Sequence, residues 1–106
     1  TTVIEPGFFR TDFLDASSVS YDDIAISDYA DYSAKRKAGL DEINHRQAGD
    51  PVKLGKAMVS LVASQDPPVR FAVGSDAYGV VTNRAATNRA EADTWRDLSV
   101  STDIVA

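Results

Sequence analysis

The sequence contains no cysteine, and this absence excludes both disulfide bridges and metal sites built on thiolates. It also lacks an apolar run of the roughly 20 residues that a membrane-spanning helix needs, and no signal-peptide pattern is visible. These absences lead us to expect a soluble protein of the cytoplasm, which is a reducing compartment.

Basic residues are outnumbered, with 11 Lys and Arg against 16 Asp and Glu, and the formal net charge is −5. A chain of this charge is repelled by nucleic-acid phosphates and by anionic lipids, so we expect neither as a partner. The apolar fraction of 43% and the charged fraction of 25% are those of an ordinary globular protein. The 106 residues allow one small domain at most.

Side chains with catalytic or metal-binding chemistry are few. His45 is the only histidine, and no carboxylates stand near it at ligand spacing, so we interpret it as a residue on the surface of a helix. Tyr29 and Tyr32 are followed four residues later by Ser33 and Arg36, and neither has the lysine one turn away that would lower the pKa of a phenol. We therefore assign the chain no catalytic residue and no metal site, which argues against a small enzyme in its own right.

The apolar pattern predicts two short strands and three helices. The β-branched run at the start predicts a strand that ends at Pro6-Gly7, and a second strand closes at Gly74. Asp50 followed by Pro51 is the clearest helix start, because Asp caps the first turn and Pro suits the first helical position. The predicted strands are Thr1–Glu5 and Val69–Val73, and the predicted helices are Asp28 to about Gln47, Val52–Ser64 and about Arg84 to Leu98.

This order of elements indicates the class of fold. A strand that returns to the sheet through helices predicts a parallel pair with a right-handed crossover. Two parallel strands do not form a stable sheet by themselves, because such strands are normally buried on both faces. We therefore predict an α/β fold in which the chain is the C-terminal segment of a larger, Rossmann-like, doubly wound parallel sheet.

The stretch EPGFFRTDF, residues 5–13, follows the first predicted strand. Ligands of doubly wound sheets bind at the carboxyl ends of strands, where loops and free backbone groups converge. Gly7 would let a ligand approach the backbone, and Thr11 offers a hydroxyl four residues later. On physical grounds alone, a Pro-Gly at the end of a strand is most often only a turn.

Three stretches then point to a family: VIEPGFFRTDFL, GDPVKLGKAMVSLV and DPPVRFAVGSDA, in this order. Together they resemble the C-terminal portion of a short-chain dehydrogenase/reductase, and the resemblance is weakest beyond about Tyr78. It implies an oxidoreductase that moves a hydride between NAD or NADP and a carbonyl/alcohol pair. The family's Gly-rich phosphate loop, its Asn-Ala-Gly motif, its catalytic Ser and its Tyr-x-x-x-Lys pair do not occur in these 106 residues. By itself, the chain is therefore expected to be inactive.

The resemblance also implies roles for residues around the Pro-Gly loop. The backbone of Phe9 and the hydroxyl of Thr11 would bind the carboxamide of the nicotinamide. The implied cofactor-binding residues are Pro6, Gly7, Phe9 and Thr11, and the implied substrate-binding residues are Phe8, Phe13 and Leu14. NAD and NADP stay equal alternatives, because the residues that discriminate between them follow the second strand of the family's sheet. The identity of the substrate cannot be read from these residues.

The resemblance divides the chain into four parts: the strand and cofactor loop (1–11), a substrate lid and helix (12–49), a helix with the final strand (50–78), and a C-terminal helix with a tail (79–106). Within the lid, we expect the acidic stretch 15–28 to be mobile until ligands bind.

Self-association is a further expectation. The helix Val52–Ser64 is apolar nearly all round, and the strand Val69–Val73 comes last in the sheet, so we expect a homo-oligomer through these two elements. The alternative to the oxidoreductase is a stand-alone, non-catalytic module that associates with itself.

Overall fold

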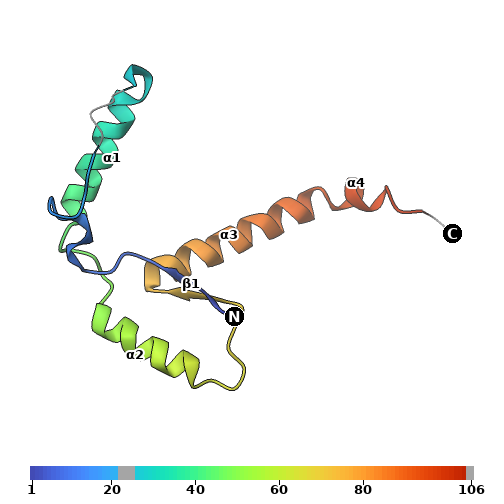
Figure 1. Cartoon of the computed structure of the whole chain (residues 1–106). Coiled ribbons are helices and arrows are strands. Elements are labelled where there is room, and N and C mark those ends of the chain that lie inside the picture. The colour runs from blue at the N-terminus through green and yellow to red at the C-terminus, as the bar shows by residue number, and fades with distance from the viewer. Residues whose placement is uncertain (22–25, 105–106) are drawn as a thin grey trace.

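The computed structural model describes residues 1–21 and 26–104. Figure 1 shows two strands near the centre, with α2 beside them and with α1 and α3 pointing away in different directions. In chain order the elements are β1 (Val3–Pro6), η1 (Asp12–Leu14), η2 (Ser27–Tyr29), α1 (Ala30–Ile43), α2 (Pro51–Val62), β2 (Arg70–Val73), α3 (Ser75–Thr94) and α4 (Arg96–Val100).

The two strands pair in parallel, as the order of elements predicted. Val3 lies opposite Arg70 and Pro6 lies opposite Val73, so both strands end at the same edge of the sheet. The ladder continues one step beyond β1, because the N–H of Gly7 donates to the carbonyl of Val73 at 2.8 Å. Pro6 has no N–H to donate and is tolerated as the last residue of the strand. The predicted α/β class, with a parallel pair, is confirmed.

Helix α2 begins where Asp50 and Pro51 predicted it. The Asp50 carboxylate accepts the N–H groups of Val52 at 2.8 Å and of Lys53 at 3.3 Å. One side of the helix faces β1, where Met58 and Leu61 line a hollow together with Thr2 and Ile4. Val62 lines this hollow as well, and on the other side of the helix Val52 and Val59 remain exposed.

Helix α3 corrects the prediction, because it starts at Ser75 rather than at about Arg84. The stretch Gly74-Ser-Asp followed by Gly79 reads as a turn in sequence. In the structure, Gly74 ends the strand with a φ of 104°, and the chain enters the helix directly after it. Gly79 lies inside α3, and apart from its neighbours and the backbone of its own helix no atom of the described residues lies within 4 Å of the position that a Cβ would take, so it is tolerated there.

Helix α1 is shorter than predicted and ends at Ile43. His45 therefore lies in the following turn with a φ of 57°, a left-handed conformation that non-glycine residues adopt rarely. The interpretation of His45 as a residue on a helix surface is wrong.

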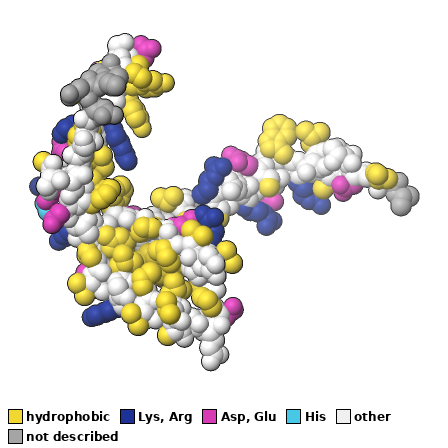
Figure 2. Space-filling model, in the orientation of Figure 1, with side chains coloured by type: hydrophobic (Ala, Val, Ile, Leu, Met, Phe, Trp, Pro, Cys, Tyr) yellow, Lys and Arg dark blue, Asp and Glu magenta, His cyan; other side chains and the backbone are white. Residues whose placement is uncertain are grey.

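The described part of the chain has almost no core. Val73 is its only buried hydrophobic residue. The radius of gyration is 20.2 Å, whereas a compact chain of this length has about 13 Å. Figure 2 shows a cluster of exposed apolar side chains over the sheet and α2. The apolar faces of these elements are therefore available to be covered by further protein.

No helix in residues 1–21 and 26–104 is both long enough and apolar enough to cross a membrane.

We expect the 106-residue chain, taken alone, to unfold without a steep cooperative transition. Ordering the backbone costs about 1–2 kcal/mol per residue, and the small buried apolar area does not offset this cost. Urea unfolding followed by circular dichroism over a series of protein concentrations measures this. A single steep transition of a monomer, unchanged by concentration, would contradict the expectation.

Candidate functional site

The Pro-Gly loop leaves β1 beside the end of β2 and is attached there. Besides the bond from Gly7 to Val73, the N–H of Phe8 donates to the Asp76 carboxylate at 2.7 Å. Asp76 lies in the first turn of α3. The loop is thus attached both to the neighbouring strand and to the helix that follows that strand.

On its other side, the loop contacts the segment that precedes α2. The carbonyl of Phe8 accepts the N–H of Gly49 at 3.1 Å, and the N–H of Arg10 donates to the carbonyl of Gly49 at 2.8 Å. The Arg10 guanidinium also donates twice to the carbonyl of Gln47, at 3.1 and 2.9 Å. These four bonds place Phe9 opposite Gly49 in an isolated parallel bridge.

Phe9 itself keeps its peptide groups free. Among the described residues, neither its N–H nor its C=O takes part in a hydrogen bond, because the bridge uses the groups of Phe8 and Arg10. A backbone donor and acceptor that are not paired with protein are available to a ligand or to water.

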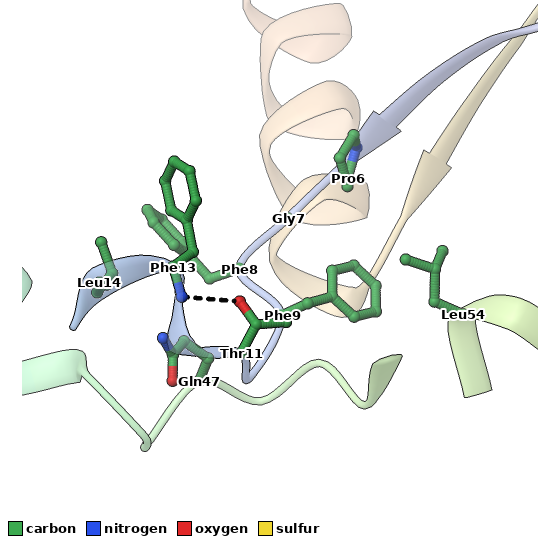
Figure 3. A pocket seen from close by; sticks show the side chains of 9 residues that line it. All are labelled: Pro6, Gly7, Phe8, Phe9, Thr11, Phe13, Leu14, Gln47 and Leu54. Atoms are coloured by element: carbon green, nitrogen blue, oxygen red, sulfur yellow. Dashed lines mark hydrogen bonds between the residues drawn. The ribbon is translucent and has the colours of Figure 1, made fainter. Parts of the chain in front are cut away.

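A pocket of about 350 Å³ lies against this loop. Figure 3 shows the Phe9 ring facing Leu54 of α2, with Phe13 and Leu14 on the side of the loop away from Leu54. The lining residues are Pro6, Gly7, Phe8, Phe9, Thr11, Phe13, Leu14, Gln47 and Leu54. All seven residues predicted to bind cofactor or substrate therefore line one pocket, which is mostly apolar with a few polar groups, as ligand pockets usually are.

Thr11 has a structural partner as well. Its hydroxyl oxygen accepts the N–H of Phe13 at 3.3 Å and so caps the short helix η1. A hydroxyl can still donate its own proton while it accepts, so capping leaves Thr11 able to donate to a ligand.

Gln47 belongs to the pocket but was not found by sequence reasoning. Its residue exposure is only 4%, and among the described residues its Oε1 has no hydrogen-bond partner. A buried amide oxygen without a partner is costly, which is typical of a group that is completed by a ligand or by water. A glutamine in a loop carries no periodic or spacing signal, so nothing in the sequence selects it.

A second polar cluster lies at the turn after α1. The Asp15 carboxylate accepts Asn44 Nδ2 at 2.7 Å and lies 2.8 Å from His45 Nε2. The hydrogen bond from Asn44, assisted by the charge of His45, lowers the pKa of Asp15 below its ordinary value. Asp12 completes a group whose potential ligand atoms all lie within 4.8 Å of one another. The chain thus brings carboxylates to His45 although the sequence spacing showed none. Hydrogen bonding within the cluster accounts for the placement of Asp15.

The parallel strand pair, the loop at its carboxyl edge and the apolar pocket define an α/β segment of the Rossmann type.

No family model matches the chain. The oxidoreductase BOA17 of Botryotinia fuckeliana is 28% identical over 100 residues, which are 94% of this chain and 36% of that protein. The 3-ketodihydrosphingosine reductase of Bacteroides thetaiotaomicron is 38% identical over 72 residues, which are 68% of this chain and 26% of that protein.

Among solved structures, the crystal structure of a short-chain dehydrogenase from Streptomyces avermitilis matches with a TM-score of 0.66 at 30% identity. The match covers 96% of this chain and 36% of that one. This chain belongs to the short-chain dehydrogenase/reductase family. It spans between 26% and 36% of the length of these three proteins. The predicted resemblance is confirmed.

We expect Gly49→Ala to destabilise the fold by about 1–3 kcal/mol. A Cβ on Gly49 would lie 2.7 Å from Phe9 Cδ1 and 2.8 Å from the Phe8 carbonyl oxygen, so the loop would have to move away. Urea denaturation of the whole protein measures the change.

Gly39→Ala is the matched control, because Gly39 lies in α1 and, apart from its neighbours and its own helix backbone, no atom of the described residues lies within 4 Å of the position of a Cβ. This change should stabilise the protein by up to about 1 kcal/mol through helix propensity. Equal effects of the two substitutions would show that the contact at Gly49 is not tight.

Proposed function

We propose that this chain forms the C-terminal portion of an NAD(P)-dependent oxidoreductase that acts on a carbonyl/alcohol pair. The observation that carries the proposal is that Phe9, whose peptide groups have no hydrogen-bond partner among the described residues, and Thr11 line one pocket at the carboxyl end of β1. The relatives named oxidoreductase, reductase and dehydrogenase support it.

The groups of the pocket fit the carboxamide of a nicotinamide. A carboxamide offers both N–H donors and a carbonyl acceptor, and Phe9 has one free N–H and one free C=O to match them. The Thr11 hydroxyl would add a third hydrogen bond. When bound, the nicotinamide supplies or accepts the hydride. The residues of this chain bind it and hold its orientation.

The other lining residues favour a substrate with an apolar portion. Phe8 is 48% exposed and Phe13 is 75% exposed, and both line the pocket with Leu14. One relative is named as a reductase of a ketodihydrosphingosine, which supports a substrate that joins a carbonyl to an apolar part. We propose residues 12–49 as the lid over this substrate. The lid includes the acidic stretch 15–28, of which residues 22–25 lie outside the described residues.

The acid–base chemistry would come from a Ser, a Tyr and a Lys that lie outside these 106 residues. The choice between NAD and NADP stays open. The division of the chain into four parts and the location in the cytoplasm stay predictions from the sequence.

We expect Thr11→Val to raise the dissociation constant of the cofactor by about two- to tenfold in the whole oxidoreductase, the scale of one lost neutral hydrogen bond. Calorimetric titration with NAD and with NADP measures it. Thr11→Ser is the control, because it keeps the hydroxyl that also caps η1. If Thr11→Val binds cofactor as the wild type does, Thr11 has no role in binding.

The outer side of α2 and the strand β2 are the proposed contact between copies of this chain. Val52 and Val59 are 68% and 72% exposed on α2, and Val69, next to β2, is 74% exposed. A second copy would cover these side chains, whereas Met58 is already turned toward β1.

We therefore expect Val59→Glu to dissociate the oligomer, because it places a charge in the centre of this apolar side. Ser60→Glu, at an exposed polar neighbour, is the matched control and should leave the oligomer intact. Light scattering over a concentration series distinguishes them. Oligomers that persist in Val59→Glu would place the contact elsewhere.

The exposed apolar side chains also fit the second candidate, a stand-alone module that associates with itself. The cofactor titration separates the two, because such a module would bind neither NAD nor NADP in any context.

A further inference from the structure

The Asp76 carboxylate joins the Pro-Gly loop to the start of α3. Its Oδ2 accepts the N–H of Phe8 at 2.7 Å, and its Oδ1 accepts the N–H of Ala77 at 2.9 Å. The two amides lie on segments that are far apart in sequence, and one carboxylate holds both of them. Its place in the first turn of a helix also favours the negative charge.

Two glycines leave room for this carboxylate. A Cβ on Gly7 would coincide with the Asp76 carboxyl group, and a Cβ on Gly74 would lie 2.7 Å from Asp76 Oδ1. Gly74 also has a φ of 104°, which favours glycine by itself, whereas Gly7 has no such φ and only the contact requires it. A side chain at position 7 would therefore clash with Asp76, and this contact explains why the Pro-Gly pair has a glycine.

The hydrogen bond from Phe8 to Asp76 affects which peptide groups of the loop remain available to a ligand. Asp76 takes the N–H of Phe8, and Gly49 donates to the Phe8 carbonyl, so both groups of Phe8 are engaged. At the next residue, Phe9, neither peptide group is hydrogen-bonded within the described residues. A peptide fixed in this way needs no reorganisation when a ligand binds.

We propose that Asp76 is a positioning residue, whose carboxylate holds the Phe8 amide so that the Phe9 peptide is presented to the cofactor. This inference rests on the proposed function, because it assigns the loop to cofactor binding. The amide of Phe8 lowers the pKa of Asp76 below its ordinary value, so the carboxylate stays charged near neutral pH. Glu5 and Asp76 line a second pocket on the other side of the loop, and Glu5 is paired there with Arg70.

The test is a double-mutant cycle in the whole oxidoreductase, read by cofactor titration and by urea denaturation. Asp76→Ala should raise the cofactor dissociation constant about tenfold, the scale of one lost hydrogen bond to a charged group. Asp76→Asn keeps an acceptor for the Phe8 amide and should remain within about threefold of the wild type. Asp97→Ala, which removes a carboxylate from the first turn of α4, is the control and should change nothing.

Gly7→Ala supplies the other half of the cycle. In the wild-type background, Gly7→Ala should weaken cofactor binding strongly. In the Asp76→Ala background, the same change should weaken binding much less, because the added methyl group then has room. Additive effects would overturn the inference, and so would cofactor binding by Asp76→Ala equal to that of the wild type. If the wild type bound neither NAD nor NADP, the proposed function would fail, and the inference would fail with it.

Discussion

The parallel pairing of β1 with β2 is the constraint on which the rest of the structure depends. It sets Pro6 opposite Val73, so that the two segments leave the sheet side by side. Gly7 then extends the ladder, and Asp76 reaches the next amide of the loop. If the register slipped by one residue, the carboxylate and the amide would no longer meet, and the free peptide would fall at another position. The pocket is therefore a product of strand register as much as of its lining side chains.

Features of the fold that rest on local signals could be predicted from the sequence. Asp50 and Pro51 act within one turn, and the start of α2 followed from them. The start of α3 could not be predicted, because the stretch Gly74-Ser-Asp is by itself a turn signal. The Asp76 carboxylate binds the N–H of Phe8, which lies 68 residues away in the sequence. The left-handed turn at His45 was missed for a similar reason, since its partner Asp15 lies before the helix. In both cases a distant contact outweighed the local preference.

The candidate site shows the same division. Its seven predicted residues came from the resemblance to a family, because a Pro-Gly pair at the end of a strand has no specific chemistry by itself. The structure gathers them around one pocket and adds Gln47, whose main chain is held by Arg10. The nearly coreless shape of the described residues agrees with a segment that spans about a third of its relatives. The sheet presents apolar faces that a longer chain would bury.

The distance in sequence between Phe8 and Asp76 has a consequence for folding kinetics. A contact across 68 residues forms only after a long loop has closed, at an entropic cost that no local interaction offsets. Helix α2 can form early from its own first turn, whereas β2 must first dock beside β1 before the loop acquires its shape. We therefore expect the Pro-Gly loop to be among the last parts of this segment to become native, so that a substitution that slows the docking of β2 delays the appearance of the pocket.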